Sequence, residues 1–134
     1  MKFKLDSIST NGKPGELINI DLKKITKKLN IDFNCNKMFY LNDLNSTKSR
    51  GNHSNSNARE LLICLNGSFE IKLNNGKKEE TYLINKNEGI FVDKNIWLDF
   101  YNFKNCIILV FVDIEYNIEK KSIYNYKDYC KLNN

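Results

Sequence analysis

The amino-acid sequence predicts an all-β domain, folded as an antiparallel barrel or a double-sheet jelly roll. Three observations support this: eight or more short apolar or alternating segments, polar turn residues at regular spacing between them, and little that reads as a long amphipathic helix. The chain has 134 residues, about the size of one domain. It contains no internal repeat and no linker, so we expect a single domain over residues 1–134.

The first half of the chain predicts two strands. Residues 16–22 alternate apolar and polar side chains, as a half-buried strand does, and residues 37–41 form a second candidate. The Lys-rich segment 22–29 between them is either a turn of helix or a loop. Residues 42–59 are rich in Asn, Ser and Thr, and we expect a loop with little potential to contribute to a core.

The second half predicts a series of short strands. An apolar run at 61–65 ends at Asn66-Gly67, and residues 68–73 then alternate strictly. Asn74-Asn75-Gly76 predicts a type I′ hairpin, because Asn and Gly tolerate positive φ. A further turn is expected at 87–89, and the remaining strands are expected at 80–84, 90–92, 97–103 and 106–112. The tail, 115–134, alternates charged residues and Tyr without a strong period, and we expect it to pack along the barrel or a partner subunit.

Composition and charge limit the kinds of molecule that the protein is expected to bind. The formal net charge is +5, but no dense basic stretch is interleaved with aromatic residues, which argues against nucleic acid. Mild positive charge suits an anionic small ligand such as a nucleotide diphosphate. No apolar run is long enough to span a bilayer, and the N-terminus lacks the apolar core of a signal peptide. We therefore expect a cytoplasmic protein without membrane partners, with its four cysteines as free thiols.

One group of residues contains side chains suited to catalysis or ligand binding. Arg50-Gly51-Asn52-His53-Ser54-Asn55 is followed by Glu60 and then Gly67. The spacing resembles the first cupin motif, in which an HxH pair and a Glu lie on adjacent inward strands, with Asn55 in place of the second His. The later His of metal-dependent cupins is absent, and one His, one Glu and an Asn make a poor ligand set for a transition metal. We predict no metal and no cofactor.

The flanking segments extend the resemblance. The chain contains in order Phe39-Tyr40, RGNH at 50–53, LLICLNGS at 61–68, NNG at 74–76, GIFV at 89–92, Ile96-Trp97, LVFVDIEY at 109–116 and YNY at 124–126. This order resembles the WxcM-like cupins, metal-free sugar 3,4-ketoisomerases that act on dTDP-4-keto-6-deoxyglucose, over roughly residues 15–130. The resemblance implies a cupin double-stranded β-helix, or jelly-roll barrel, and a homodimer with strand exchange near the N-terminus.

The resemblance also implies site residues. Arg50, Gly51 and His53 match the family pattern RGxHAH, Tyr40 matches the active-site Tyr, and Trp97 matches a Trp at the pocket mouth. Three positions depart from the family. Asn55 replaces one of the catalytic His pair, Glu60 replaces a Gln, and Leu98 replaces a His that commonly follows the Trp.

The chemistry explains these residue types. Moving a ketone from C4 to C3 requires loss of the C3 proton and return of a proton at C4, through an enediolate. An imidazole, with an ordinary pKa of about 6.5, can accept and return that proton. We therefore expect His53 to be the acid and base, and Tyr40 to pass a proton between the sugar oxygens. An amide cannot cycle a proton near neutral pH, so Asn55 is expected to stabilise the enediolate.

The remaining predicted contacts concern binding. Arg50 is expected to hold the diphosphate by paired charge-assisted hydrogen bonds, and Glu60 and Trp97 to contact the substrate. Glu60 is also a candidate for the lost proton acceptor. Plainer interpretations stay open: an ion pair between Arg50 and Glu60, core positions for Tyr40 and Trp97, and packing for the tail tyrosines.

The sequence therefore predicts a metal-independent isomerase of a nucleotide-linked, dTDP-type 4-keto-6-deoxy sugar, acting in deoxysugar and polysaccharide biosynthesis. Two alternatives remain. One is a catalytically impaired cupin that only binds a nucleotide sugar, and the other is an isomerase or epimerase for a different sugar. Exchange of the C3 proton with solvent distinguishes an isomerase from a binding protein.

Overall fold

Two long antiparallel strands organise the molecule, whose computed structural model describes residues 1–133. They are β6 (Arg59–Asn74) and β9 (Trp97–Asp113), which pair with each other along nearly their whole length. The first half of β6 pairs with β8 (Glu88–Val92) and its second half with β7 (Glu79–Asn85). In the same way β9 pairs with β5 (Arg50–Asn55) near its start and with β4 (Cys35–Leu44) near its end.

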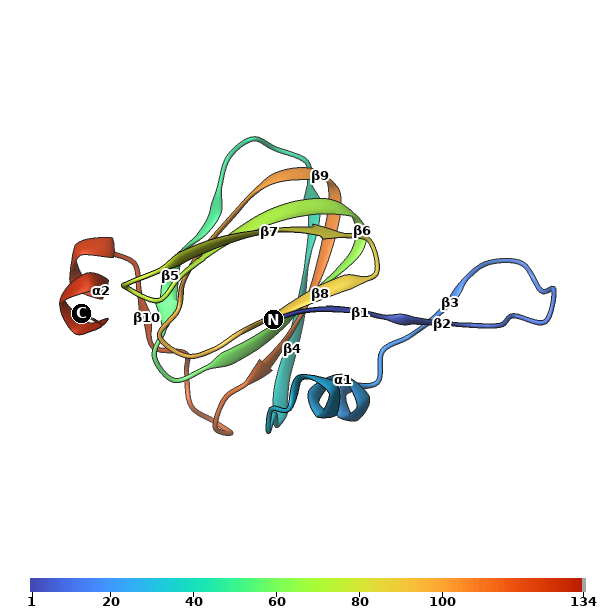
Figure 1. Ribbon diagram of the computed structural model, residues 1–134, viewed down its shortest axis with the longest axis horizontal. Helices are drawn as coiled ribbons and strands as arrows, with labels where there is room; N and C mark the ends of the chain where they lie inside the picture. The colour runs from blue at the N-terminus through green and yellow to red at the C-terminus, as the bar shows by residue number, and fades with distance from the viewer. Residues whose placement is uncertain (134) are drawn as a thin grey trace.

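Each long strand therefore runs through both halves of one eight-stranded sheet, and the two halves face each other as the two sheets of a jelly roll (Figure 1). One sheet has the order β1-β8-β6-β9-β4, with β1 at Lys2–Lys4. The other has the order β7-β6-β9-β5-β10, with β10 at Ser122–Ile123. Apolar side chains from both sheets meet between them in the main core. This arrangement confirms the predicted all-β jelly roll.

The predicted breaks within β6 and β9 are wrong. Asn66-Gly67 does not end a strand, because the pairing of β6 with β9 shifts register between Cys64 and Ser68 and then continues. Gly67 takes a φ of 68° there, and Asn102 and Asn105 in β9 take 52° and 46°. Residues with positive φ bend a strand through bulges when a partner strand continues beside them. Two predicted pairs of short strands are thus two single bent strands.

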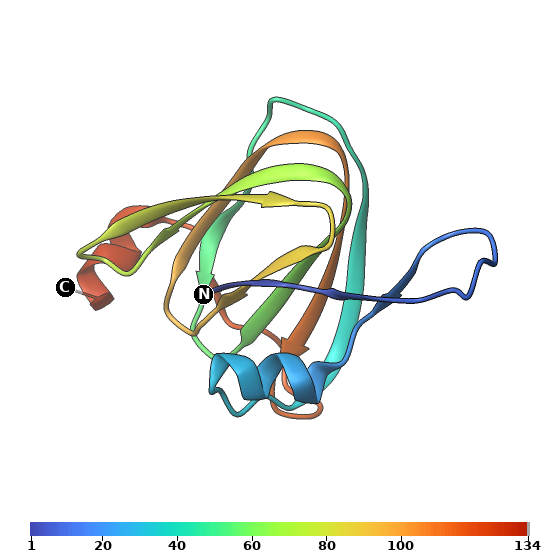
Figure 2. The same cartoon turned by 45° about the vertical axis from the view of Figure 1, so that its right-hand side comes forward.

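A helix covers the outside of the first sheet (Figure 2). Residues left open as helix or loop form α1 (Leu22–Leu29), which starts because the Asp21 side chain accepts a hydrogen bond from the Lys24 N–H at 3.1 Å. Its buried residue Ile25 belongs to a second apolar cluster with Leu61 and Ile63. The helix begins inside the segment predicted as a strand, so that β3 spans only Leu17–Asn19.

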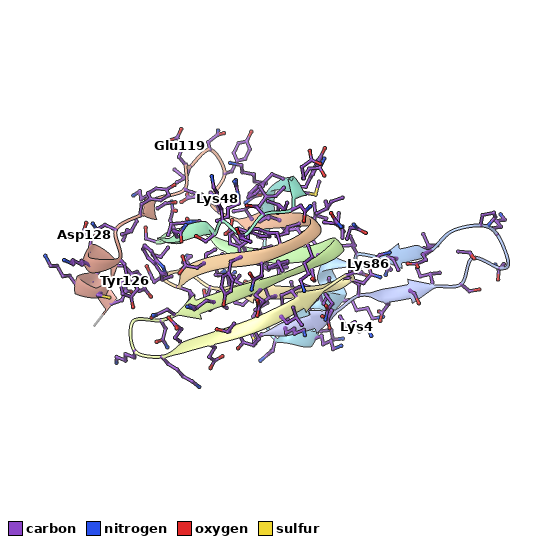
Figure 3. All side chains as sticks on the ribbon, turned by 90° about the horizontal axis from the view of Figure 1, so that it is seen from above. Lys4, Lys48, Lys86, Glu119, Tyr126 and Asp128 are labelled. Atoms are coloured by element: carbon purple, nitrogen blue, oxygen red, sulfur yellow. The ribbon has the colours of Figure 1, made fainter. Side chains whose placement is uncertain are left out.

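An arm projects from the barrel. It is the hairpin of β2 (Asp6–Ile8) with β3, in which Ser7 pairs with Ile18. Figure 3 shows this arm extending from one end of the molecule, opposite the end that carries the C-terminal helix. Its Ile8 and Leu17 side chains are 46% and 49% exposed. The arm therefore presents apolar surface that the rest of this chain does not cover.

The β6–β7 hairpin is present, but the predicted turn type is wrong. Of residues 75–78 only Gly76 has a positive φ, at 92°, whereas a type I′ turn needs two such residues in succession. The Asn75 side-chain oxygen instead accepts hydrogen bonds from the N–H groups of Lys77 and Lys78. The turn before β8 lies at Lys86-Asn87, and Gly89 lies inside the strand.

The tail packs along the barrel and ends in a helix that the sequence did not predict, α2 (Tyr126–Asn133). Tyr129 anchors it: its buried hydroxyl lies 2.9 and 2.6 Å from the carbonyl oxygens of Asn74 and Asn95, which share its single proton. Burial raises the pKa of Tyr129. In residues 1–133 no helix has the length and apolar character needed to cross a membrane.

Candidate active site

A cavity of about 330 Å³ opens between the two sheets. Inward side chains of β4, β5, β6 and β9 form its wall, and two residues of the tail complete it. The lining residues are Phe39, Leu41, Arg50, Gly51, His53, Glu60, Leu62, Leu98, Phe100, Val110, Lys120 and Tyr124. An apolar wall with few polar groups is typical of a small-molecule site.

A bulge in β5 brings Arg50 and His53 to the same side. Residues three positions apart point to opposite faces of a regular strand. Here Arg50 pairs with Phe100 and His53 with Leu98. Asn52, with a φ of 52°, is therefore an extra residue in β5 that has no partner in β9. The extra residue re-aims His53 into the cavity beside Arg50. The segment predicted as a loop at 42–59 therefore contains a strand, and that prediction is wrong.

His53 packs against an aromatic ring, and one of its ring nitrogens lacks a hydrogen-bond partner in the described part of the chain. Its ring centroid lies 5.6 Å from that of Tyr124. Its Nδ1 atom is buried and has no hydrogen-bond partner among residues 1–133. An imidazole that lines a cavity can exchange a proton with a ligand bound there.

Glu60 is the most buried charged group of the cavity, at 5% exposure. Its Oε1 accepts a hydrogen bond from Asn55 Nδ2 at 3.3 Å, and its Oε2 lies 3.6 Å from Lys120 Nζ. Asn55 Oδ1 in turn accepts from the Ser122 hydroxyl at 2.7 Å. A buried carboxylate is costly unless paired, and here an amide and an ammonium group satisfy it.

Two hydrogen bonds of the Asn57 side chain, called here the Asn57 clip, fix the loop that carries Lys120 over the cavity. Asn57 Nδ2 donates to the Glu119 carbonyl oxygen at 2.9 Å, and Asn57 Oδ1 accepts from the Lys121 N–H at 2.8 Å. These bonds fix both neighbours of Lys120, whose Nζ lies 5.3 Å from the centroid of the Phe39 ring. Glu119, labelled in Figure 3, marks the loop that carries this clip.

The structure corrects the prediction for Tyr40. Its side chain is 65% exposed and does not line the cavity. Side chains alternate along a strand, and in β4 it is Phe39 and Leu41 that face inward. Tyr40 therefore lies on the outer face of the sheet, outside both this cavity and the core.

Trp97 and Asn55 are also corrected. Trp97 is buried at 7% exposure, but it packs against Tyr126 and Tyr129 of α2, with ring centroids 5.1 and 5.6 Å away, and does not line the cavity. It is a core aromatic, as the plainer interpretation held. Asn55 is 3% exposed and lies behind Glu60, where its amide is taken by Glu60 and Ser122. It lies outside the lining of the cavity, in a position to orient Glu60.

Arg50, His53 and Glu60 line one cavity, as the predicted site requires. The alternative ion pair between Arg50 and Glu60 is not formed, since Lys120 is the cation beside Glu60. Within residues 1–133, no three His, Cys, Asp or Glu side chains gather as a metal site would need.

Sequence reasoning missed Lys120 and Tyr124. The tail that carries them has no periodic pattern, and its tyrosines were expected to serve packing. Tyr124 packs against the His53 ring and also lines the cavity, which makes it a further candidate for ligand contact.

A family model and a characterised relative place the chain in the same family. The model of the FdtA family, described as WxcM-like, C-terminal, matches residues 3–134. A TDP-4-oxo-6-deoxy-alpha-D-glucose-3,4-oxoisomerase of Aneurinibacillus thermoaerophilus is 26% identical over 111 residues, which cover 82% of this chain and 80% of that protein.

Solved structures agree. WlaRA, a TDP-fucose-3,4-ketoisomerase from Campylobacter jejuni, is 34% identical, with a TM-score of 0.79 over 100% of this chain and 95% of its own. A His-to-Asn variant of the 3,4-ketoisomerase QdtA from Thermoanaerobacterium thermosaccharolyticum, in complex with TDP-4-keto-6-deoxyglucose, is 27% identical, with a TM-score of 0.80 over 99% and 92%. With a jelly roll, a cavity in the expected place and a family match over nearly its whole length, this chain belongs to the FdtA family of WxcM-like, C-terminal proteins.

Proposed function

We propose that this protein is a metal-independent 3,4-ketoisomerase of a TDP-linked 4-keto-6-deoxy sugar. The observation that carries the proposal is the single imidazole, His53, which the β5 bulge directs into a cavity beside Arg50. Relatives that align over nearly the whole chain are named as TDP-sugar 3,4-ketoisomerases. His53 removes the C3 proton and returns it at C4.

Arg50 and the aromatic wall supply binding. Arg50 is exposed at the cavity wall, where its guanidinium can hold a diphosphate through two parallel hydrogen bonds. Phe39 and Tyr124 offer flat apolar surfaces to the sugar ring or the base. The remaining polar wall, Glu60 with Lys120, faces the sugar hydroxyls.

The test is incubation of the protein with TDP-4-keto-6-deoxyglucose in deuterium oxide, followed by proton NMR of the sugar. We expect loss of the C3 proton signal and growth of a 3-keto product. Ligand line broadening without exchange would favour the alternative of a cupin that only binds a nucleotide sugar. Exchange only with another 4-keto sugar would retain the chemistry and change the substrate.

The cellular setting completes the proposal. We place the protein in the cytoplasm, in the biosynthesis of deoxysugars for a polysaccharide. The four cysteines are free thiols, which suits a reducing compartment.

We further propose a homodimer that exchanges strands through the β2–β3 arm, whose apolar Ile8 and Leu17 are uncovered within one chain. We expect a molar mass in solution of twice the 15.7 kDa of the chain. A variant with residues 6–19 replaced by a short Gly-Ser linker is expected to be monomeric. Light scattering measures both, and a monomeric parent protein would contradict the proposed dimer.

A further inference from the structure

The isomerisation needs two kinds of proton transfer, one between carbons and one between oxygens. His53 serves the carbons, but the group expected to serve the oxygens, Tyr40, points away from the cavity. An Arg guanidinium does not release a proton in proteins, which removes Arg50 from the candidates. Tyr124 also carries an exchangeable proton in the cavity, but its ring lies against His53, with centroids 5.6 Å apart. Glu60 and Lys120 contact each other and can pass a proton between them.

Building on the proposed isomerase function, we propose that Glu60 and Lys120 together carry the proton from O3 to O4 of the sugar. The geometry supports a pair acting as a unit, because Lys120 Nζ lies 3.6 Å from Glu60 Oε2 inside the cavity. Asn55 holds the Glu60 side chain, and the Asn57 clip fixes the backbone on either side of Lys120. Preorganised groups contribute most to a transition state because they need not reorient.

The steps balance as follows. His53 takes the C3 proton, and the electron pair of the C3–H bond forms C3=C4 while the carbonyl pair moves to O4. Lys120 gives a proton to O4, and Glu60 takes the O3 proton, so that the O3–H pair becomes the C3=O bond. The C3=C4 pair collects the proton of His53 at C4. Glu60 then returns its proton to Lys120, which restores the starting carboxylate and ammonium.

This assignment also explains Asn55. An amide at this position donates a hydrogen bond to Glu60 Oε1 at 3.3 Å and accepts one from Ser122 at 2.7 Å, with no charge of its own. It therefore leaves Glu60 free to alternate between carboxylate and carboxylic acid. Asn55 is a positioning residue for the pair.

Two substitutions test the shuttle. Glu60→Gln keeps the size of the side chain and an acceptor for Asn55, but a carboxamide does not cycle a proton. Lys120→Arg keeps the positive charge beside Glu60, but a guanidinium does not release a proton. In each variant we expect product formation to fall about 100-fold or more, while exchange of the C3 proton in deuterium oxide stays within about threefold of the parent because His53 is intact.

Matched controls lie on the same loop. Glu119→Gln and Lys121→Arg make the same chemical changes at exposed side chains, and the bonds that the clip makes to these residues use only their backbone atoms. Both controls are expected to match the parent protein in exchange and in product formation. Thermal unfolding midpoints of all four variants identify any that does not fold, and either test variant alone decides the matter.

The outcomes separate the shuttle from the proposed function. If the parent isomerises its substrate and a folded test variant does so at the same rate, the shuttle is overturned and the isomerase stands. If Tyr40→Phe stops product formation while C3 exchange continues, Tyr40 carries the oxygen proton and the shuttle is overturned. If the parent neither exchanges the C3 proton nor forms product, the proposed function fails and the shuttle fails with it.

Discussion

Replacing His53 with Asn is expected to lower both C3 proton exchange and product formation by about a thousandfold, within the usual range for loss of a general base. Asn keeps a polar side chain of similar reach but cannot accept a proton. The chain contains one His, so no second imidazole can take over. NMR in deuterium oxide measures both quantities in one sample.

Two further measurements sharpen this prediction. Binding of TDP, followed by calorimetry, is expected to be nearly unchanged in His53→Asn, because Arg50 is untouched. In His53→Ala, added imidazole is expected to restore part of the C3 exchange by entering the space left in the cavity. Normal exchange in His53→Asn would show that another group removes the C3 proton.

The largest effect on stability is expected from Gly67→Ala. Gly67 has a φ of 68°, and a Cβ added there would lie 1.9 Å from the Lys104 carbonyl oxygen and 2.6 Å from that of Asn105. The backbone conformation alone costs a residue with a Cβ about 1–2 kcal/mol. The clash with rigid backbone adds to this, and we expect a total loss of at least about 4 kcal/mol. That is a large fraction of the stability of an ordinary domain.

Gly12→Ala is the matched control. Gly12 has a similar φ of 79°, but nothing lies within 4 Å of an added Cβ. We expect this variant to lose only about 1–2 kcal/mol, the cost of the left-handed conformation. Urea unfolding measures the free energy of unfolding of both variants. Equal losses would mean that the bend in β6 tolerates a side chain and that the contact with β9 is not tight.

The sequence predicted where strand segments lie better than it predicted which neighbouring segments join into one strand. Alternation at 68–73 and the apolar runs at 61–65 and 106–112 located segments that must be buried, which is information local to the chain. Whether Asn66-Gly67 ends a strand or bends it depends on whether β9 continues alongside. That pairing joins residues far apart in the sequence, so no local pattern contains it.

The site shows the same division. The pattern from Arg50 to His53 marked the cavity wall, because its residue types are unusual together. The adjacent aromatics Phe39 and Tyr40 gave no sign of which one faces inward, since alternation fixes only that they face opposite ways. The strand register of β4 against β9 decides this, and it places Phe39 opposite Val110 inside the barrel. Lys120 lies beside Glu60 because hydrogen bonds from Asn57 fix the backbone of the loop that carries it, and these join residues far apart in the sequence.

The tail that closes the cavity has a consequence for biosynthesis of the protein itself. A ribosome releases the chain from its N-terminus, and Lys120 and Tyr124 follow every long strand of the barrel. Strand β5 waits for its partners β9 and β10 in the same way. A nascent or truncated chain that ends after β9 therefore holds His53 and Glu60 without the cation and the ring that complete their pocket. Synthesis of residues 120–124 is therefore the step that completes the wall of the cavity.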